Sequence, residues 1–435
     1  MGKLEKYSSY KDSGVEWLGE IPYNWEIKEL KYALKFTTGG TPSSGVENYY
    51  NGEEPWVTIA DMTGRYIEKS HFISKKAVRE CNMQIVPKNS LLYSFKLSVG
   101  QVAFTKEEIY TNEAIASFYP SKNIDLNFWY YVLPIFLIKN ANTNIYGAFL
   151  LNQDLIKNAL IIFPPKQEQT KIASFLNEKT AQIDEVISQK QKLIELLKER
   201  KQIVINDAVT KGLDKDVEFV DSGVEWIGKI PNHWEVKKMK YFIDIKGGFA
   251  FDSMAFQDSG IQIIKIANTY MNKLSLDRQP TFVNESYLKS HSDWVVSKGD
   301  ILMSLTGTMG KKDYGFAILL NNENKYLLNQ RVAKLNVKNN MSSDYLLTIL
   351  HSDMYLNQLY SLPSGTKQAN LSNNNVIEIL MPIPPVDERE KICTFIKNKS
   401  EKIDKAIEQQ QNYISKLKEY KASLIDSVVT GKVRV

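Results

Sequence analysis

A tandem duplication constrains this chain more than any other feature of its sequence. Residues 12–32 read DSGVEWLGEIPYNWEIKELKY, and residues 221–241 read DSGVEWIGKIPNHWEVKKMKY. At this offset 14 of the 21 positions are identical, and both copies keep the tryptophan pairs Trp17/Trp226 and Trp25/Trp234. The chain is therefore expected to contain two related halves that begin with the same structural block.

A second repeated block closes each half. Residues 164–184, PPKQEQTKIASFLNEKTAQID, correspond to residues 384–404, PPVDEREKICTFIKNKSEKID, and the ends VINDAVTKG (204–212) and LIDSVVTGK (424–432) match as well. Proline suits the first turn of a helix, and no Gly or Pro follows either Pro-Pro pair for more than forty residues. Each half is therefore predicted to end in a long helix.

The apolar spacing of these segments predicts a coiled coil. Alternating steps of four and three give a seam in each copy: Ile172, Leu176, Lys179, Ile183, Val186, Lys190, Leu193, Leu197, Arg200 and Val204, and then Ile392, Ile396, Lys399, Ile403, Ala406, Gln410, Tyr413, Leu417, Tyr420 and Leu424. One such helix per half favours an antiparallel pair within the chain, spanning roughly 60 Å at 1.5 Å per residue. A second apolar row fits either a wide core face or a docking surface for other subunits: Ile187, Ile194 and Ile205, with Ile407, Ile414 and Ile425.

Between the blocks the halves diverge over a shared skeleton. Residues 86–94 align with 296–304, Gly100 with Gly310, and 112–116 with 329–333. Strands are predicted at 56–62, 89–95, 261–268 and 300–305, and buried helices at 126–138 and 342–352. The divergence fits two readers of different targets, and it also fits an old duplication that has drifted.

These patterns predict a mixed α/β fold with two pseudo-symmetric globular domains separated by two long antiparallel coiled-coil helices. The expected limits are 1–163 for the first globular domain, 164–212 for the first helix, 213–383 for the second domain and 384–435 for the second helix.

Composition excludes several classes of protein. No run of eighteen apolar residues suggests a membrane span, and the N-terminus lacks the apolar core of a signal peptide, so a cytoplasmic protein is expected. Two distant cysteines, Cys81 and Cys393, exclude a disulfide framework, and four scattered histidines show no metal-ligand spacing. The net charge is +5, and residues 33–160 and 242–380 are nearly neutral, so any DNA-binding face must be local.

The doubled DSGVEW block, the doubled Pro-Pro entry to a long helix, and the phrases LNQRVAKL and SGTKQANLS resemble the specificity subunits of Type I restriction–modification systems. The resemblance covers nearly the whole chain. It implies two target recognition domains, each reading one part of a bipartite asymmetric sequence in double-stranded DNA, with the helices as a spacer. It also implies docking of two methyltransferase subunits that bind S-adenosylmethionine and, in a full complex, restriction subunits that use ATP and Mg. The chain itself is expected to bind no cofactor and to have no catalysis.

The absence of catalytic motifs agrees with a protein that recognises DNA and does not modify it. The chain has no Asn/Asp-Pro-Pro-aromatic motif for adenine methylation and no GxxxxGK[ST] loop for a nucleotide-driven motor. Two alternatives stay open, a nuclease with an unrecognised site and a coiled-coil scaffold that does not bind DNA.

Candidate DNA-binding residues are polar and basic side chains in expected loops. In the first half they are Thr38, Thr41, Arg65, Lys96, Ser98, Gln101, Asn144 and Tyr146; in the second they are Lys246, Thr306, Thr308, Lys311, Lys312, Gln330, Arg331, Lys367 and Gln368. Structural roles compete with this assignment at two places: Gly39-Gly40 also fits a simple turn, and Arg331 also fits an internal ion pair.

Overall fold

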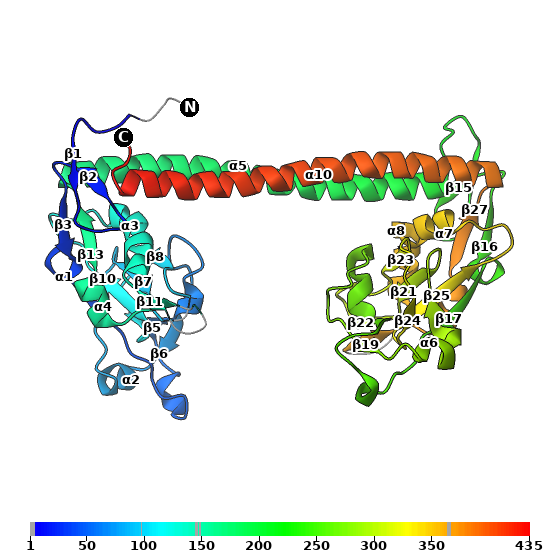
Figure 1. Ribbon diagram of the computed structural model, residues 1–435, viewed down its shortest axis with the longest axis horizontal. Helices are drawn as coiled ribbons and strands as arrows, with labels where there is room; N and C mark the ends of the chain where they lie inside the picture. The colour runs from blue at the N-terminus through cyan, green and yellow to red at the C-terminus, as the bar shows by residue number, and fades with distance from the viewer. Residues whose placement is uncertain (1–4, 97, 144–146, 148, 363–366) are drawn as a thin grey trace. The chain divides into compact units, whose positions relative to one another are not determined.

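The chain forms two compact units in the computed structural model, which describes residues 5–435 except 97, 144–146, 148 and 363–366 (Figure 1). Unit 1 comprises Met1–Lys190 with Asn412–Val435, and unit 2 comprises Gln191–Gln411. Helices α5 (Lys166–Lys211) and α10 (Val386–Val429) each cross from one unit into the other. Each unit therefore contains one of the two globular domains that were predicted to be recognition domains, and one part of each long helix.

The first repeated block forms the same small structure in both units. Strands β1 (Tyr10–Asp12) and β2 (Glu20–Pro22) pair in unit 1, and β14 (Phe219–Asp221) and β15 (Lys229–Pro231) pair in unit 2. In both, the aspartate that ends the first strand accepts a hydrogen bond of 2.9 Å from the glycine N–H two residues later. The glycines of the block have positive φ, which explains why they are duplicated: Gly14, Gly19, Gly223 and Gly228.

Short two-stranded ladders join the start and the end of each recognition domain. β3 (Glu26–Glu29) pairs antiparallel with β13 (Leu160–Phe163), and β16 (Glu235–Lys238) pairs with β27 (Leu380–Ile383). The Pro-Pro pair and the long helix follow β13 and β27 directly. The ladders therefore fix where each long helix leaves its recognition domain.

Two sheets form the body of each recognition domain. In unit 1 the antiparallel order is β4 (Phe36–Thr38), β10 (Ile115–Phe118), β7 (Leu91–Ser94) and β8 (Val102–Phe104), and the second sheet is β6 (His71–Ile73), β5 (Glu54–Val57) and β9 (Tyr110–Thr111). In unit 2 the order is β17 (Ile243–Gly247), β25 (Val332–Val337), β21 (Ile301–Ser304) and β23 (Ala317–Leu319), and the second sheet is β19 (Phe282–Val283), β18 (Ile261–Ile264), β24 (Tyr326–Leu328) and β20 (Val295–Val296). In each unit one face of the first sheet packs on the second sheet.

A helix from the predicted apolar segment covers the other face of the first sheet. Helix α3 (Leu126–Lys139) starts at the N-cap Asp125 and packs on β7 and β8 in unit 1. Helix α7 (Ser343–Leu350) starts at the N-cap Ser342 and packs on β23 in unit 2. Both predicted helices are confirmed, because a side-chain cap precedes a continuous apolar segment in each.

The strands predicted at 56–62 and 261–268 are shorter than expected. β5 ends at Val57 and β18 ends at Ile264, and a 3-10 turn follows each strand. Side chains cause both turns: Asp61 accepts a 2.8 Å hydrogen bond from the Thr58 N–H, and Asn268 accepts one of 2.8 Å from the Lys265 N–H. A side chain that bonds its own backbone competes with the sheet ladder.

The two sheets confirm most of the repeated skeleton and correct one position. Ser94 and Ser304 are both buried. The Ser94 Oγ accepts a 3.0 Å hydrogen bond from the Gln101 N–H, and the Ser304 Oγ accepts one of 3.0 Å from the Phe316 N–H, in each case just before the next strand begins. The Gly100 N–H donates to the Ser94 carbonyl, and the Gly315 N–H donates to the Ser304 carbonyl. Gly100 therefore matches Gly315, and its alignment with Gly310 was wrong because the second loop is longer.

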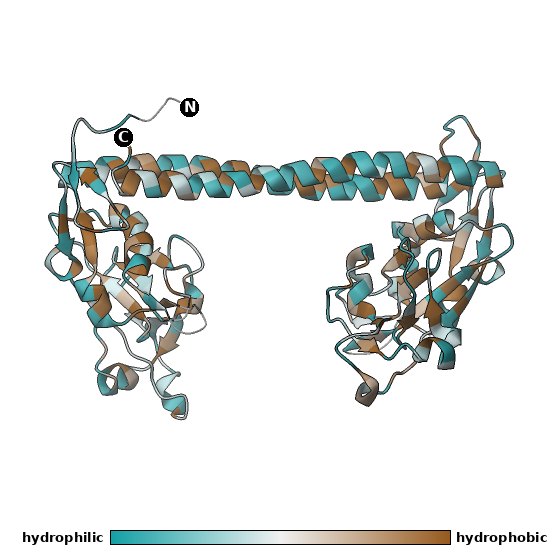
Figure 2. Cartoon of the chain, in the orientation of Figure 1, coloured by the Kyte–Doolittle hydropathy of each residue, from teal (hydrophilic) through white to brown (hydrophobic). Residues whose placement is uncertain are grey.

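The long helices pack together in antiparallel directions, with ion pairs at matching places. In unit 1, Lys421 Nζ lies 2.6 Å from Asp184, and in unit 2, Lys201 Nζ lies 2.7 Å from Asp404. Also in unit 1, Lys190 lies over the Tyr413 ring. As the residue number rises along α5, the number of the contacting residue in α10 falls. The two helices are therefore antiparallel. Figure 2 shows apolar residues recurring along both helices between polar ones.

Burial corrects every second position of the predicted seam in α5 from Lys179 onward, where the neighbouring Thr180 is buried instead. Ile194 is buried, whereas the predicted seam residue Leu193 is 39% exposed. The second copy agrees, since Ile414 is buried and Tyr413 is 51% exposed. The apolar row containing Ile194 and Ile414 is thus core at these positions. The buried and half-buried positions still alternate by three and four residues, at Leu176, Thr180, Ile183, Ile187, Lys190, Ile194 and Leu197, so the 3.5-residue period is confirmed and only the order of the two steps was wrong.

No helix within the described ranges is both long and apolar enough to cross a membrane.

Candidate nucleic-acid interface

A two-stranded ribbon gathers most of the second-half candidates. β22 (Thr306–Thr308) pairs antiparallel with β26 (Gln368–Asn370), and Thr308 lies opposite Gln368. Lys367 precedes β26, and its carbonyl accepts a hydrogen bond from Met309 N–H. Arg331 joins the group, because its Nη1 donates to Asn370 Oδ1 at 3.0 Å. Candidates that are distant in sequence therefore share one surface.

The loop that follows β22 holds two exposed lysines, Lys311 and Lys312. Its shape is fixed by Asp313, whose Oδ1 accepts the Thr308 N–H at 2.5 Å. The Tyr360 hydroxyl donates to the Lys312 carbonyl at 3.3 Å, and burial raises the pKa of Tyr360 to about 12. Lys312 has a φ of 51°, a conformation that needs such support in a residue other than glycine. The two cations are thus carried on an ordered loop.

The remaining second-half candidates differ in accessibility. Thr306 is buried, because β22 starts inside the domain and becomes exposed only at Thr308. Lys246 is exposed, with Nζ 3.6 Å from Asp293 and 5.4 Å from the centre of the Trp294 ring. Gln330 is exposed, and its backbone N–H donates to the Phe249 carbonyl. Lys246 and Gln330 therefore belong to the end of the β17–β25 ladder and not to the ribbon.

In the first half, the Thr38–Thr41 loop is tied to neighbouring side chains. Thr38 Oγ1 accepts a 2.8 Å hydrogen bond from Gln153, and the Thr41 hydroxyl donates to Glu113, which lowers the pKa of that carboxyl. Gly39 has a structural role, because a Cβ there would lie 1.7 Å from the Thr111 carbonyl oxygen. The glycine therefore serves close packing.

A loop between β7 and β8 carries three further candidates, Lys96, Ser98 and Gln101, and all three are exposed. The Ser98 carbonyl accepts a 2.6 Å hydrogen bond from the buried Ser94 hydroxyl. Ser98 has a φ of 45°. This loop is thus held from inside the domain and presents its polar side chains outward.

Arg65 lies elsewhere and is already engaged. Its guanidinium donates to Asn127 Oδ1 at 2.9 Å and lies 4.6 Å from the centre of the Tyr130 ring. These contacts attach the Arg65 loop to α3. Asn144 and Tyr146 lie outside the described residues.

Sequence reasoning missed Asn370, which is exposed on the ribbon beside Arg331. The alternation of exposed Gln368, buried Ala369 and exposed Asn370 is the period-two pattern of a half-buried strand. This alternation of polar and apolar residues could have indicated Asn370 from the sequence.

This arrangement suits DNA recognition through a groove. A two-stranded ribbon fits the major groove, where amide side chains pair with adenine and Arg or Lys pairs with guanine. Lysines beside the ribbon can neutralise phosphates, which supplies local attraction in a nearly neutral domain.

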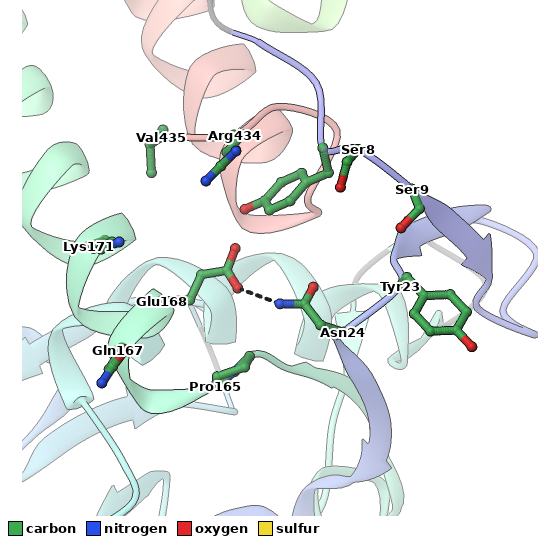
Figure 3. A pocket seen from close by; sticks show the side chains of 11 residues that line it. Ser8, Ser9, Tyr23, Asn24, Pro165, Gln167, Glu168, Lys171, Arg434 and Val435 are labelled. Carbon is green, nitrogen blue, oxygen red and sulfur yellow. Dashed lines mark hydrogen bonds between the residues drawn. The ribbon is translucent and has the colours of Figure 1, made fainter.

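Unit 1 also contains a polar pocket of about 530 Å³, where residues 7–9 and the C-terminal Arg434 and Val435 lie beside the start of α5 (Figure 3). Asn24 Nδ2 donates to Glu168 at 3.4 Å across this pocket. The matching contact of unit 2 pairs His233 with Glu388 at 2.6 Å, and Trp234 also donates to Glu388. The pocket therefore lies where the first repeated block contacts the start of the long helix, and unit 2 makes the same contact with different side chains. Across the described parts of the chain, no three His, Cys, Asp or Glu side chains gather as a metal site.

Comparison with known proteins identifies the family. The sequence profile of the Type I restriction modification DNA specificity domain matches residues 22–196 and again residues 231–415. The Type I restriction enzyme MjaVIII specificity subunit of Methanocaldococcus jannaschii is 26% identical over 420 residues, covering 95% of this chain and 94% of that protein. The MjaIX specificity subunit of the same organism is 24% identical over 445 residues, covering 100% and 99%.

Solved structures share the fold. A chain from a structure of the type I R-M system, reported for its complex assembly and conformational transition, has a TM-score of 0.72 at 14% identity, covering 94% of this chain and 98% of that one. The HsdS subunit from Thermoanaerobacter tengcongensis has a TM-score of 0.52 at 14% identity, covering 95% and 98%. Two copies of the specificity domain, each with its own ribbon or loops and its own long helix, make this chain a member of the family of Type I restriction–modification specificity subunits.

Proposed function

We propose that each recognition domain reads one part of a split, asymmetric DNA target, and that α5 and α10 set the unread gap between the parts. The observation that carries this proposal is the β22–β26 ribbon, where Thr308, Gln368 and two lysines are presented on one exposed, ordered surface. The matching part of unit 1 presents different residues on its loops. Different reading residues on a shared frame are what two different half-targets require.

Membership of the family supports a proposal for the partners. The chain binds double-stranded DNA together with two methyltransferase subunits, one for each half of the repeat, and the methyltransferase subunits carry S-adenosylmethionine. Where a restriction subunit joins the complex, ATP and Mg belong to that subunit. The chain contributes recognition and geometry and no catalytic group or cofactor, and it acts in the cytoplasm.

The most informative experiment is to co-express the chain with candidate methyltransferase subunits and to map methylated adenines across the host genome. The expected result is a two-part motif with a fixed unread gap. A single contiguous motif, or no new methylation with any methyltransferase subunit, would count against the proposal.

Two alternative functions give different results in simple assays. A nuclease would cleave DNA as a purified single chain when divalent metal is added. A scaffold would show no sequence-dependent DNA binding, either alone or with a methyltransferase subunit. The ribbon favours sequence-specific DNA recognition over a nuclease or a scaffold, because its exposed amide and lysine side chains suit base edges and phosphates.

A further inference from the structure

Arg331 lies at the corner of a tight turn that joins the two sheets of unit 2, between β24 and β25. A 2.9 Å hydrogen bond from the Val332 N–H to the Asn329 carbonyl closes the turn. The Arg331 carbonyl in turn accepts a 2.9 Å hydrogen bond from the N–H of Leu305, which lies between β21 and β22. The backbone of Arg331 is therefore fixed, while its side chain is exposed.

The β22–β26 ribbon orients the guanidinium of Arg331. Its Nη1 donates to Asn370 Oδ1 at 3.0 Å. Asn370 and Arg331 are also connected through one buried residue, because the Leu305 carbonyl accepts a 2.9 Å hydrogen bond from the Leu371 N–H. Thr306, which pairs with Asn370 across the ribbon, is buried as well. The exposed guanidinium is thus attached to the interior of the domain at both ends of the arginine.

Arg331 and Asn370 together present hydrogen-bond donors. The sequence left open an internal ion pair for Arg331, but in the described parts of the chain its partner is an amide and not a carboxylate. A guanidinium carries several N–H donors in a rigid plane, and this contact uses one of them. The contact also occupies Asn370 Oδ1, so the amide is left with its Nδ2 donor. The site therefore suits a partner with closely spaced acceptors.

The matching turn of unit 1 carries no arginine. There the Phe95 N–H donates to the Ala114 carbonyl at 3.0 Å, as the Leu305 N–H does to that of Arg331. Ala114 therefore holds the matching position, and it is buried. The arginine candidate of unit 1, Arg65, is instead attached to α3. The two recognition domains share the turn, and unit 2 alone has the oriented guanidinium there.

We propose that Arg331 reads a guanine in the part of the DNA target that unit 2 recognises, and that Asn370 is the positioning residue for its guanidinium. In the major groove guanine presents two neighbouring acceptors, O6 and N7, which match an arginine fork. Adenine presents a donor beside its acceptor, so one N–H of the fork would face another donor. The inference rests on the proposed function, in which the ribbon recognises DNA.

A phosphate also accepts hydrogen bonds from a guanidinium. Orientation favours the base, because the planar fork of Arg331 is held in place by Asn370 and loses little freedom when it binds. The exposed Lys311 and Lys312 already lie beside the ribbon, where they suit phosphates. The two kinds of contact give different results, because only base reading depends on the DNA sequence.

The test uses the full chain in complex with the methyltransferase subunits that give methylation in co-expression. Exchange of residues 242–380 first identifies the part of the motif that unit 2 reads, and each G·C pair of that part is then replaced by A·T. At one position we expect the wild-type complex to bind at least about fivefold more weakly, measured by fluorescence anisotropy. Arg331→Ala should bind the original and the altered DNA equally well.

The matched control is Arg278→Ala, which removes another exposed arginine of unit 2, one whose guanidinium lies 4.5 Å from the centre of the Tyr270 ring. This variant should discriminate as the wild-type chain does. Asn370→Asp keeps an acceptor for Arg331, so it should keep the preference for guanine even if the added charge weakens binding to every sequence. Asn370→Ala should lose part of the preference, and an unchanged preference would exclude Asn370 as the positioning residue.

A second measurement does not depend on the folding of a variant. Replacing the guanine by 7-deazaguanine removes the N7 acceptor, which should weaken the wild-type complex and leave Arg331→Ala unaffected. The inference is overturned if Arg331→Ala weakens binding to all sequences alike, because the guanidinium then contacts phosphate. A part of the motif without any G·C pair also overturns it. If the wild-type complex shows no sequence-dependent DNA binding, the proposed function falls first, and that result is distinct from a failure of Arg331 alone.

Discussion

Two glycines are required by close packing between backbones. Gly39 and Gly248 each follow the edge strand of the four-stranded sheet, and a Cβ on Gly248 would lie 2.2 Å from the Asn329 carbonyl oxygen. A methyl group at either site must displace backbone, which costs about 1–3 kcal/mol by the usual measure of overpacking. We expect Gly39→Ala to lower the unfolding midpoint in denaturant, whereas Gly64→Ala, which meets nothing within 4 Å, should not. Equal midpoints for the two variants would contradict this role.

A histidine gives unit 2 a pH dependence. Burial and, to a smaller extent, Lys201 hold the pKa of His351 below its usual range, although a hydrogen bond to the Ala317 carbonyl opposes them. The unfolded chain binds the proton more readily, so the stabilisation is complete above the unfolded pKa near 6.5 and is lost as the pH falls below it.

We expect His351→Asn to reduce the loss of stability between about pH 7.5 and about pH 5, because the titrating group is removed. Thermal unfolding at the two pH values measures the difference. His71→Asn is the control, since His71 has a side chain that is 61% exposed. A wild-type chain and a His351→Asn variant that lose the same stability on acidification would exclude this group as the cause.

Candidate residues could be predicted by type but not by orientation. Lys311, Lys312 and Gln368 were proposed because polar and basic side chains in expected loops suit DNA, and the structure shows that all three are exposed. Sequence could not show that Arg65 is occupied by Asn127 and Tyr130, because those partners lie more than sixty positions away. Such partners become visible only when the fold brings distant segments together.

Among the elements, the long helices were the most predictable, and their exact packing face was not. Their start at the Pro-Pro pairs and their end near glycine follow from local chemistry. The packing face depends on the order of the three- and four-residue steps within each heptad, and the adjacent apolar residues Leu193 and Ile194 are compatible with either order by sequence. Short strands such as β5 were predicted too long, because a single Asp61 side chain ends the strand.

Adjacent substitutions test the corrected packing face of α5. Ile194 is 8% exposed and Leu193 is 39% exposed. We expect Ile194→Ala to cost about 2–4 kcal/mol of unfolding free energy, as for a buried aliphatic side chain, and Leu193→Ala to cost less than about 1 kcal/mol. Chemical denaturation followed by helical circular dichroism measures both. The reverse order would restore the heptad seam predicted from sequence.

The ribbon makes a separate prediction about DNA binding. If Lys311 and Lys312 contact phosphates, each Lys→Ala change should weaken binding for all sequences and should reduce the slope of log affinity against log salt by about 1. Gln368→Ala should instead relax the choice of base in one part of the target and leave the salt slope nearly unchanged. Filter binding or anisotropy over a salt series, with the methyltransferase complex, separates the two effects. A pure loss of affinity with Gln368→Ala would remove this residue from base reading.

At the scale of the whole molecule, the repeat suggests that different segments recognise the DNA sequence and set the gap between its two parts. Residues 242–380 lie between the repeated blocks of the second half, and exchanging them for the segment of another specificity subunit should change one part of the methylated motif only. The other part and the gap belong to elements that stay in place. A motif altered on both sides of the gap would show that the two recognition domains do not read independently.

The helices offer the strictest test of how the gap is set. Inserting four residues after Lys190 in α5 and four after Gln411 in α10 lengthens both helices, where each crosses from one unit to the other. Four residues are close to one helical turn, so the buried faces keep their direction while each helix gains about 6 Å. At about 3.4 Å per base pair, the unread gap should grow by about two base pairs, with both parts of the motif unchanged. Methylated-adenine mapping reads the gap directly. An insertion in α5 alone is the control, because it mismatches the antiparallel pair and should lower stability without defining a new gap. A doubly lengthened chain that still methylates the original spacing would show that the helices do not set it.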